Sequence, residues 1–138
     1  MFIKCFKKRK EEKLKQEKEI EKWNKMWELY GDGKIESPYK ELMYYQEEIF
    51  NGGHAQYFFN LQNKNTIRRH LNQLKIILPK YFYVNLENAY NICILQDESD
   101  DTNDIEKLEE LLMKSDGFFY DNEEVIENIL KDYSMTIE

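Results

Sequence analysis

The chain has few glycines, prolines and cysteines for its length: five, two and two among 138 residues. A β-rich fold needs frequent turns, which draw on glycine and proline, so their scarcity argues against such a fold. Cys5 and Cys93 lie far apart and match neither a disulfide framework nor a zinc-binding spacing. This usage is typical of reduced thiols in a cytoplasmic protein.

Long apolar runs are also missing. No run approaches the roughly 20 residues that a membrane-spanning helix needs. The opening segment, MFIKCFKKRK, has an apolar patch shorter than the core of a secretion signal, and its basic residues mostly follow the patch. We therefore expect a soluble cytoplasmic protein without a transmembrane segment.

The sequence lacks the motifs of common catalytic machineries. It contains no phosphate-binding loop, no G-x-S-x-G and no reactive cysteine context. Its two histidines, His54 and His70, do not have the H-x-x-x-H spacing of helical metal ligands. The sequence accordingly predicts a non-enzymatic protein with no catalytic residue, no cofactor and no metal site.

What the chain does have is apolar and aromatic residues and an uneven distribution of charge. Hydrophobic residues make up 41% and aromatic residues 14%, enough for a packed core. The net charge of −7 is the sum of +5 over residues 1–25, zero over 26–95 and −12 over 96–138. Such asymmetry points to electrostatic interactions with a partner and does not bear on the fold.

The spacing of apolar residues predicts an all-α protein of six or seven helices. Residues 1–30 are expected to be a basic, partly solvated N-terminal extension whose helix covers 7–30, and residues 31–138 one compact all-α domain. Asn103 is expected to cap a helix that ends at Ser115-Asp116-Gly117, and Asp121 to cap the last one. The other predicted helices are 38–50, 54–61, 67–78 and 82–93.

The segment EEIFNGGHAQYFFN, residues 47–60, interrupts a helical pattern with two glycines. Asn51 or Gly52 is expected to take the left-handed conformation that stops a helix. Gln56 and Asn60 are four positions apart and therefore share a helical face. From that face their side-chain amides can reach the carboxylate of Glu48 or the unpaired carbonyls at the end of the preceding helix. We predict a structural polar corner; the alternative is a ligand or catalytic pocket with His54 as a base. The corner residues are Glu48, Asn51, Gly52, Gly53, Gln56 and Asn60.

These residues also carry a resemblance. The pattern from Glu48 to Asn60 resembles the E-x-x-N-G-G-x-x-Q-[YF]-F-x-N signature of a bacterial domain family, largely of unknown function, that includes a DNA mimic protein. The segment SDGFFYDNEEVIENILKDY is similar to the family's closing pattern, so the resemblance covers about residues 37–134. That family usually has phenylalanine where this chain has His54, which implies that His54→Phe is tolerated.

The acidic C-terminal third is the predicted partner-binding surface. The resemblance implies that its carboxylates imitate a DNA phosphate backbone and bind a basic, DNA-binding protein. A toxin-neutralising, immunity-type protein would use the same surface, and a merely solubilising role is the third alternative. The face is not expected to bind nucleic acid directly, and a homodimer is an open alternative. The predicted residues are Asp97, Glu98, Asp100, Asp101, Asp104, Glu106, Glu109 and Glu110.

The basic beginning of the chain admits several interpretations. It combines apolar Phe2, Ile3 and Phe6 with five cations. This composition suits anionic lipid, nucleic acid or the acidic end of a second copy, and it also suits a solvated terminus. The five cations are Lys4, Lys7, Lys8, Arg9 and Lys10.

Overall fold

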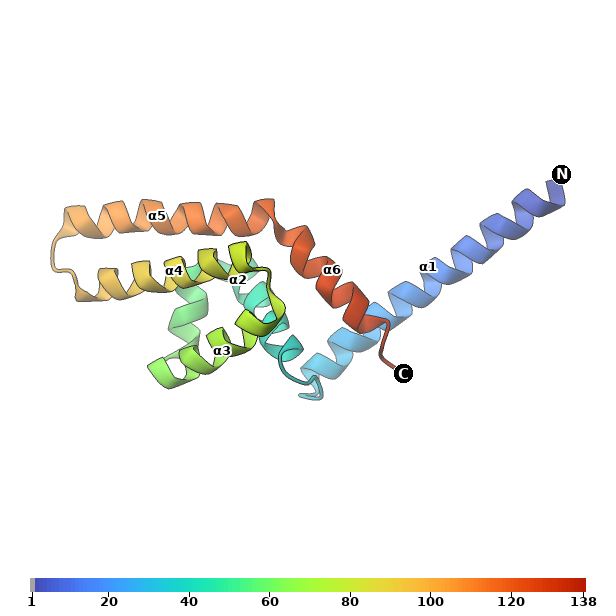
Figure 1. Cartoon of the computed structure of the whole chain (residues 1–138), viewed down its shortest axis with the longest axis horizontal. Coiled ribbons are helices and arrows are strands. Elements are labelled where there is room, and N and C mark those ends of the chain that lie inside the picture. The colour runs from blue at the N-terminus through green and yellow to red at the C-terminus, as the bar shows by residue number, and fades with distance from the viewer. Residues whose placement is uncertain (1) are drawn as a thin grey trace. The chain divides into compact units, whose positions relative to one another are not determined.

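A computed structural model describes residues 2–138, and over that range it consists of six α-helices without a strand (Figure 1). The predicted all-α class is therefore confirmed. Among the described residues, no helix combines the length and the apolar character needed to cross a membrane. The helices are α1 (Phe2–Gly31), α2 (Tyr39–Leu61), α3 (Lys64–Ile77), α4 (Lys80–Glu98), α5 (Thr102–Asp121) and α6 (Glu123–Ser134).

The chain divides into two compact units. The first holds the N-terminal residues through Ile35 together with Glu127–Glu138, and the second holds Glu36–Ile126. The domain boundary predicted between residues 30 and 31 stays a prediction.

In the first unit, α1 meets the C-terminal segment only in its second half. Met26 is fully buried, and the Lys22 ammonium donates a hydrogen bond to the Ile137 carbonyl. The Trp23 and Trp27 rings pack edge to face at 6.3 Å. The helix begins at Phe2, five residues earlier than predicted, because a helix nucleated in the Lys- and Glu-rich stretch that follows propagates readily into these residues.

The second unit is built around an antiparallel hairpin of helices α4 and α5, against which α2 packs (Figure 1). The helix predicted over 67–78 is confirmed as α3, and its four apolar positions are buried as the +4, +3, +4 spacing requires. Phe119 of α5 is fully buried, with its ring 5.3 Å from Tyr45 of α2 and 5.8 Å from Phe82 of α4. These aromatic contacts form the centre of the unit's core.

Both ends of α5 differ from the prediction. The cap is Asp101, whose carboxylate accepts a hydrogen bond from the Asn103 backbone N–H at 2.8 Å. The helix also runs past its expected stop at Gly117 and ends only at Asp121, so Asp121 is not the cap of the last helix. Phe119 is buried beyond the glycine, and this packing outweighs the weak helical preference of Gly117.

The helix break predicted at Asn51-Gly52-Gly53 is present as a kink inside α2. The left-handed residue is Gly53, with φ of 76°, whereas Gly52 is extended at −170°, so the expected assignment to Asn51 or Gly52 was wrong. A Cβ on Gly53 would lie 2.5 Å from Asp116 Oδ2. Both the backbone conformation and the close carboxylate therefore require glycine there.

We expect Gly53→Ala to lower the free energy of unfolding by more than about 1 kcal/mol, because φ near 76° with ψ near 180° is essentially restricted to glycine. Gly117→Ala is the matched control: it lies inside α5 with open space around its Cα and should gain about 0.5–1 kcal/mol. Urea unfolding followed by circular dichroism measures both. Wild-type stability of Gly53→Ala would contradict the proposed role of Gly53.

Candidate functional site

The kink in α2 leaves the helical segment that follows it with unpaired backbone N–H groups. One of them is the N–H of His54, which donates to Asp116 Oδ1 at 2.9 Å. Asp116 lies on α5, 62 residues away, so one helix caps another across the core. A carboxylate suits this place because it accepts hydrogen bonds and complements the positive end of the helix dipole.

The His54 side chain is fully buried and both its ring nitrogens have partners. Nδ1 lies 2.6 Å from Asp116 Oδ1, and Nε2 lies 2.7 Å from the Tyr45 hydroxyl. Burial raises the pKa of Tyr45 well above its ordinary value, so the phenol keeps its proton at neutral pH. Nδ1 donates to the Asp116 carboxylate, which can only accept, and Nε2 shares the second hydrogen bond with the Tyr45 hydroxyl.

The predicted corner brings three of its side chains together. Asn60 Nδ2 donates to Glu48 Oε2 at 2.5 Å, and Gln56 Nε2 reaches the same oxygen at 3.4 Å. These bonds join the segments on either side of the kink. Asn51, Gly52 and Asn60 are exposed, so this part of the corner lies at the surface.

Sequence reasoning missed the buried half of the corner. Asp116 and Tyr45 complete the environment of His54, and the Tyr120 hydroxyl donates to the Ile49 carbonyl at 3.0 Å. Asp116 and Tyr120 belong to the segment SDGFFY, which the resemblance had already singled out. The sequence motif does not reveal that this segment contacts residues 45–54, because the two become neighbours only when α2 packs on α5.

This geometry argues against His54 as a general base. A base must offer a nitrogen to a substrate proton, and neither ring nitrogen is free. Its carboxylate partner is Asp116 of α5. Among the described residues, no group of His, Cys, Asp and Glu side chains is arranged to hold a metal ion.

All eight predicted acidic residues are exposed, and they lie where α4 and α5 meet. Asp97 and Glu98 end α4, Asp100 and Asp101 are in the connection, and the other four are on α5. The connection between the two helices is three residues long, Ser99–Asp101. We call this set of eight residues the acidic hairpin end.

Few contacts within the chain engage these carboxylates. Asp101 caps α5, and Glu109 Oε2 accepts a hydrogen bond from Gln96 Nε2 at 3.1 Å. None of the eight forms an ion pair within residues 2–138. Exposed Leu111 and Met113 follow on α5. Unpaired charge beside exposed apolar side chains is a surface on which a protein partner can find both kinds of contact.

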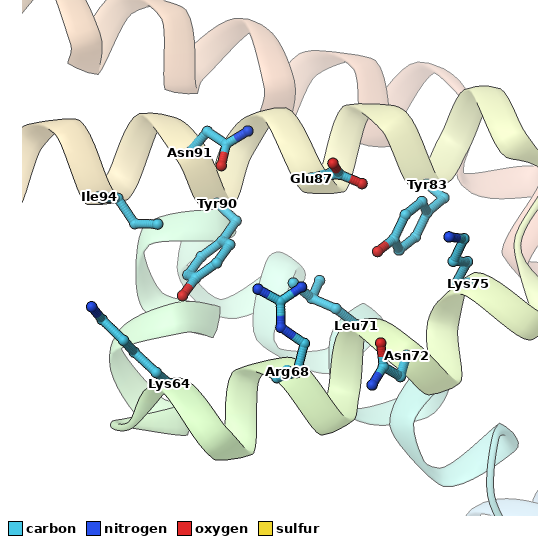
Figure 2. A pocket seen from close by; sticks show the side chains of 10 residues that line it. All are labelled: Lys64, Arg68, Leu71, Asn72, Lys75, Tyr83, Glu87, Tyr90, Asn91 and Ile94. Atoms are coloured by element: carbon cyan, nitrogen blue, oxygen red, sulfur yellow. The ribbon is translucent and has the colours of Figure 1, made fainter.

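Two grooves border α4. The smaller, of about 460 Å³, lies between α3 and α4, where Lys64, Arg68 and Lys75 of α3 face Tyr83, Glu87 and Tyr90 of α4 (Figure 2). The larger, of about 1190 Å³, includes Gln56 and Asn60 of the corner as well as Cys93. Burial, with help from nearby carboxylates, raises the pKa of the Cys93 thiol to about 12, so this cysteine stays protonated and is a poor nucleophile.

The His54 contacts reverse the expectation that phenylalanine is tolerated at this position. His54→Phe leaves the buried Tyr45 hydroxyl without a partner, which should cost about 1–3 kcal/mol. Adding Tyr45→Phe removes the orphaned hydroxyl, so the double variant should be more stable than His54→Phe alone. Urea unfolding of the wild type, both single variants and the double variant measures the coupling. An unchanged midpoint for His54→Phe would show that the hydrogen bonds are dispensable.

Comparison with known proteins gives one match. No curated protein and no solved structure matches the chain significantly. The profile of the DMP19-like protein family matches residues 39–137, which is more than half of the chain and includes the kinked α2, the aromatic core and the acidic hairpin end. The chain therefore belongs to the DMP19-like family, a family of DNA mimic proteins.

Proposed function

We propose that this protein acts without catalysis by binding a basic protein, in the first place a DNA-binding protein, through its acidic hairpin end. The observation that carries the proposal is the exposure of eight carboxylates at the junction of two packed helices, none of which forms an ion pair among residues 2–138. Membership of a DNA mimic family supports the same partner class. A cytoplasmic location, expected from the two free cysteines, is consistent with such a partner.

The density of negative charge supports DNA mimicry. The four acids of α5 between Asp104 and Glu110 span about 9 Å of helix axis at 1.5 Å per residue, or about one charge per 3 Å. One strand of B-DNA presents about one charge per 3.4 Å. Glu106, Glu109 and Glu110 follow i, i+3, i+4 spacing and share a face, so one partner surface can meet all three.

Hydrogen bonds between the two helices hold this charge pattern in place. Gln96 Nε2 of α4 donates to the Ile105 carbonyl of α5 at 3.3 Å and to Glu109 Oε2 at 3.1 Å. A preformed array loses less conformational freedom on binding than a disordered acidic tail. Phosphates of a duplex are similarly held at fixed spacings, which is the property that a mimic must reproduce.

Two alternatives use different chemistry. An immunity-type protein would present the same carboxylates to a basic toxin whose surface need not bind DNA. A small-ligand binder would use the groove beside Gln56 and Asn60. Competition by duplex DNA distinguishes an immunity-type protein from a DNA mimic. Charge reversal at the acidic hairpin end distinguishes a small-ligand binder from both of them.

The test is a titration of a partner captured from host lysate, at two salt concentrations and with or without duplex DNA. We expect at least a tenfold weaker Kd at 0.3 M than at 0.05 M salt, because screening shortens the Debye length. A variant with Glu98, Asp100, Glu106 and Glu110 reversed to lysine should lose binding. Asp101 is spared because it caps α5.

The matched control reverses Glu36, Glu47, Glu87 and Asp121, which are exposed outside the hairpin end. It changes the net charge by the same amount and should bind like the wild type. Equal binding by the hairpin variant would contradict the proposal, and equal loss in both variants would show that only net charge matters. Salt-sensitive binding without DNA competition would favour the immunity-type alternative.

A further inference from the structure

The first two-thirds of α1 is exposed to an unusual degree. Every residue from Phe2 to Glu21 is exposed, so this stretch of helix is surrounded by solvent. Five of these residues are large and apolar. Three of them lie close together near the start of the helix: Phe2, Ile3 and Phe6 are exposed by 87%, 70% and 69%. Single exposed apolar residues are common, but three within five positions form a patch that indicates an interaction surface.

The helical arrangement of these residues is amphipathic. At 100° per residue, Phe2, Ile3 and Phe6 fall within about 100° of one another, and Cys5 borders them. Lys4 and Lys8 point to the other side, and Lys7 borders the apolar face beside Ile3. Arg9 and Lys10 lie one turn further along on the apolar side, where long side chains can extend toward an interface.

The charge of this segment has one sign. Residues 2–10 contain five Lys and Arg and no acidic residue. None of the five forms an ion pair within the described part of the chain. The segment therefore combines an unpartnered apolar face with unneutralised positive charge, which are the two signals that peripheral attachment to an anionic bilayer uses.

We propose that residues 2–10 bind the surface of an anionic lipid bilayer. The helix lies in the plane of the interface, with Phe2, Ile3 and Phe6 in the boundary between headgroups and acyl chains. The cations contact lipid phosphates and carboxylates. This function is separate from the proposed partner binding, because it uses α1 and none of the residues of the acidic hairpin end.

The rival occupant of this face is the acidic hairpin end of a second copy, which also carries exposed Leu111 and Met113. The arrangement on α1 favours the bilayer. Some cations of residues 2–10 lie opposite the apolar face, and others lie one turn further along the helix on the same side as that face. Together they can reach lipid headgroups on all sides of an inserted helix. A protein surface about as wide as a helix would contact only one side of α1, and therefore only some of these cations.

The test is flotation of the full-length chain with vesicles of phosphatidylcholine alone or with 30% phosphatidylserine. We expect binding to the anionic vesicles, at least fivefold weaker binding to the neutral ones, and weakening of the former with salt. Phe2→Ser with Phe6→Ser should reduce the bound fraction at least fivefold at unchanged charge. Lys7→Glu with Lys8→Glu should do the same at unchanged apolar surface.

Matched controls come from the second unit. Phe59→Ser removes another highly exposed phenylalanine, at 81%, and Lys64→Glu with Lys75→Glu removes two other exposed lysines. Both controls should float like the wild type, as should the variant with the reversed hairpin end. Circular dichroism should show little change in helix content, because residues 2–10 are exposed in the folded chain.

Three outcomes would overturn the inference. One is a wild-type chain that does not float with anionic vesicles. The second is undiminished flotation of the Phe2→Ser, Phe6→Ser variant. The third is a wild-type chain that self-associates in sedimentation equilibrium but does not bind vesicles. If this self-association is lost both in the Phe2→Ser, Phe6→Ser variant and in the variant with the reversed hairpin end, a second copy of the chain covers the apolar face of α1.

Discussion

The carboxylate of Asp116 is the group on which the second unit most depends. One oxygen accepts hydrogen bonds from the backbone and the ring of His54, and the other lies so close to Gly53 that no Cβ fits between them. It therefore caps the second segment of α2 and joins it to α5. The requirement for glycine at position 53 and the orientation of His54 both follow from the position of this carboxylate, which lies 62 residues from His54 in the sequence.

This contact explains why a polar cluster sits beside an aromatic core. His54 could not be buried among Tyr45, Phe58 and Phe119 if its nitrogens lacked partners, since burying unpaired polar groups is costly. Tyr45 and Asp116 supply those partners, so the imidazole serves as a polar link inside apolar surroundings. The corner is best explained as a polar network that fixes the geometry of two helix segments, which is the structural role predicted from the sequence.

Charge and scaffold are accordingly separated within the second unit. The corner and its aromatic neighbours hold α2 against α5, while the acidic hairpin end lies at the junction of α4 and α5 and takes little part in internal bonding. Substitution of exposed acids can thus leave the fold intact.

The sequence alone determined the helical class, the apolar face of α3 and the break at the glycines, because these depend on local spacing and propensity. Of the two partners that it left open for the corner amides, the structure shows the Glu48 carboxylate. The sequence also located the acidic residues, since charge is read directly from composition. Only the tertiary structure decided that Gly53 is the left-handed residue, that α5 continues through Gly117, and that His54 is paired with Asp116 and Tyr45. Each of these depends on contacts between distant segments: the Asp116 carboxylate occupies the space beside Gly53, and the buried Phe119 keeps α5 helical. Local sequence patterns carry no information about which distant side chain will fill such a place.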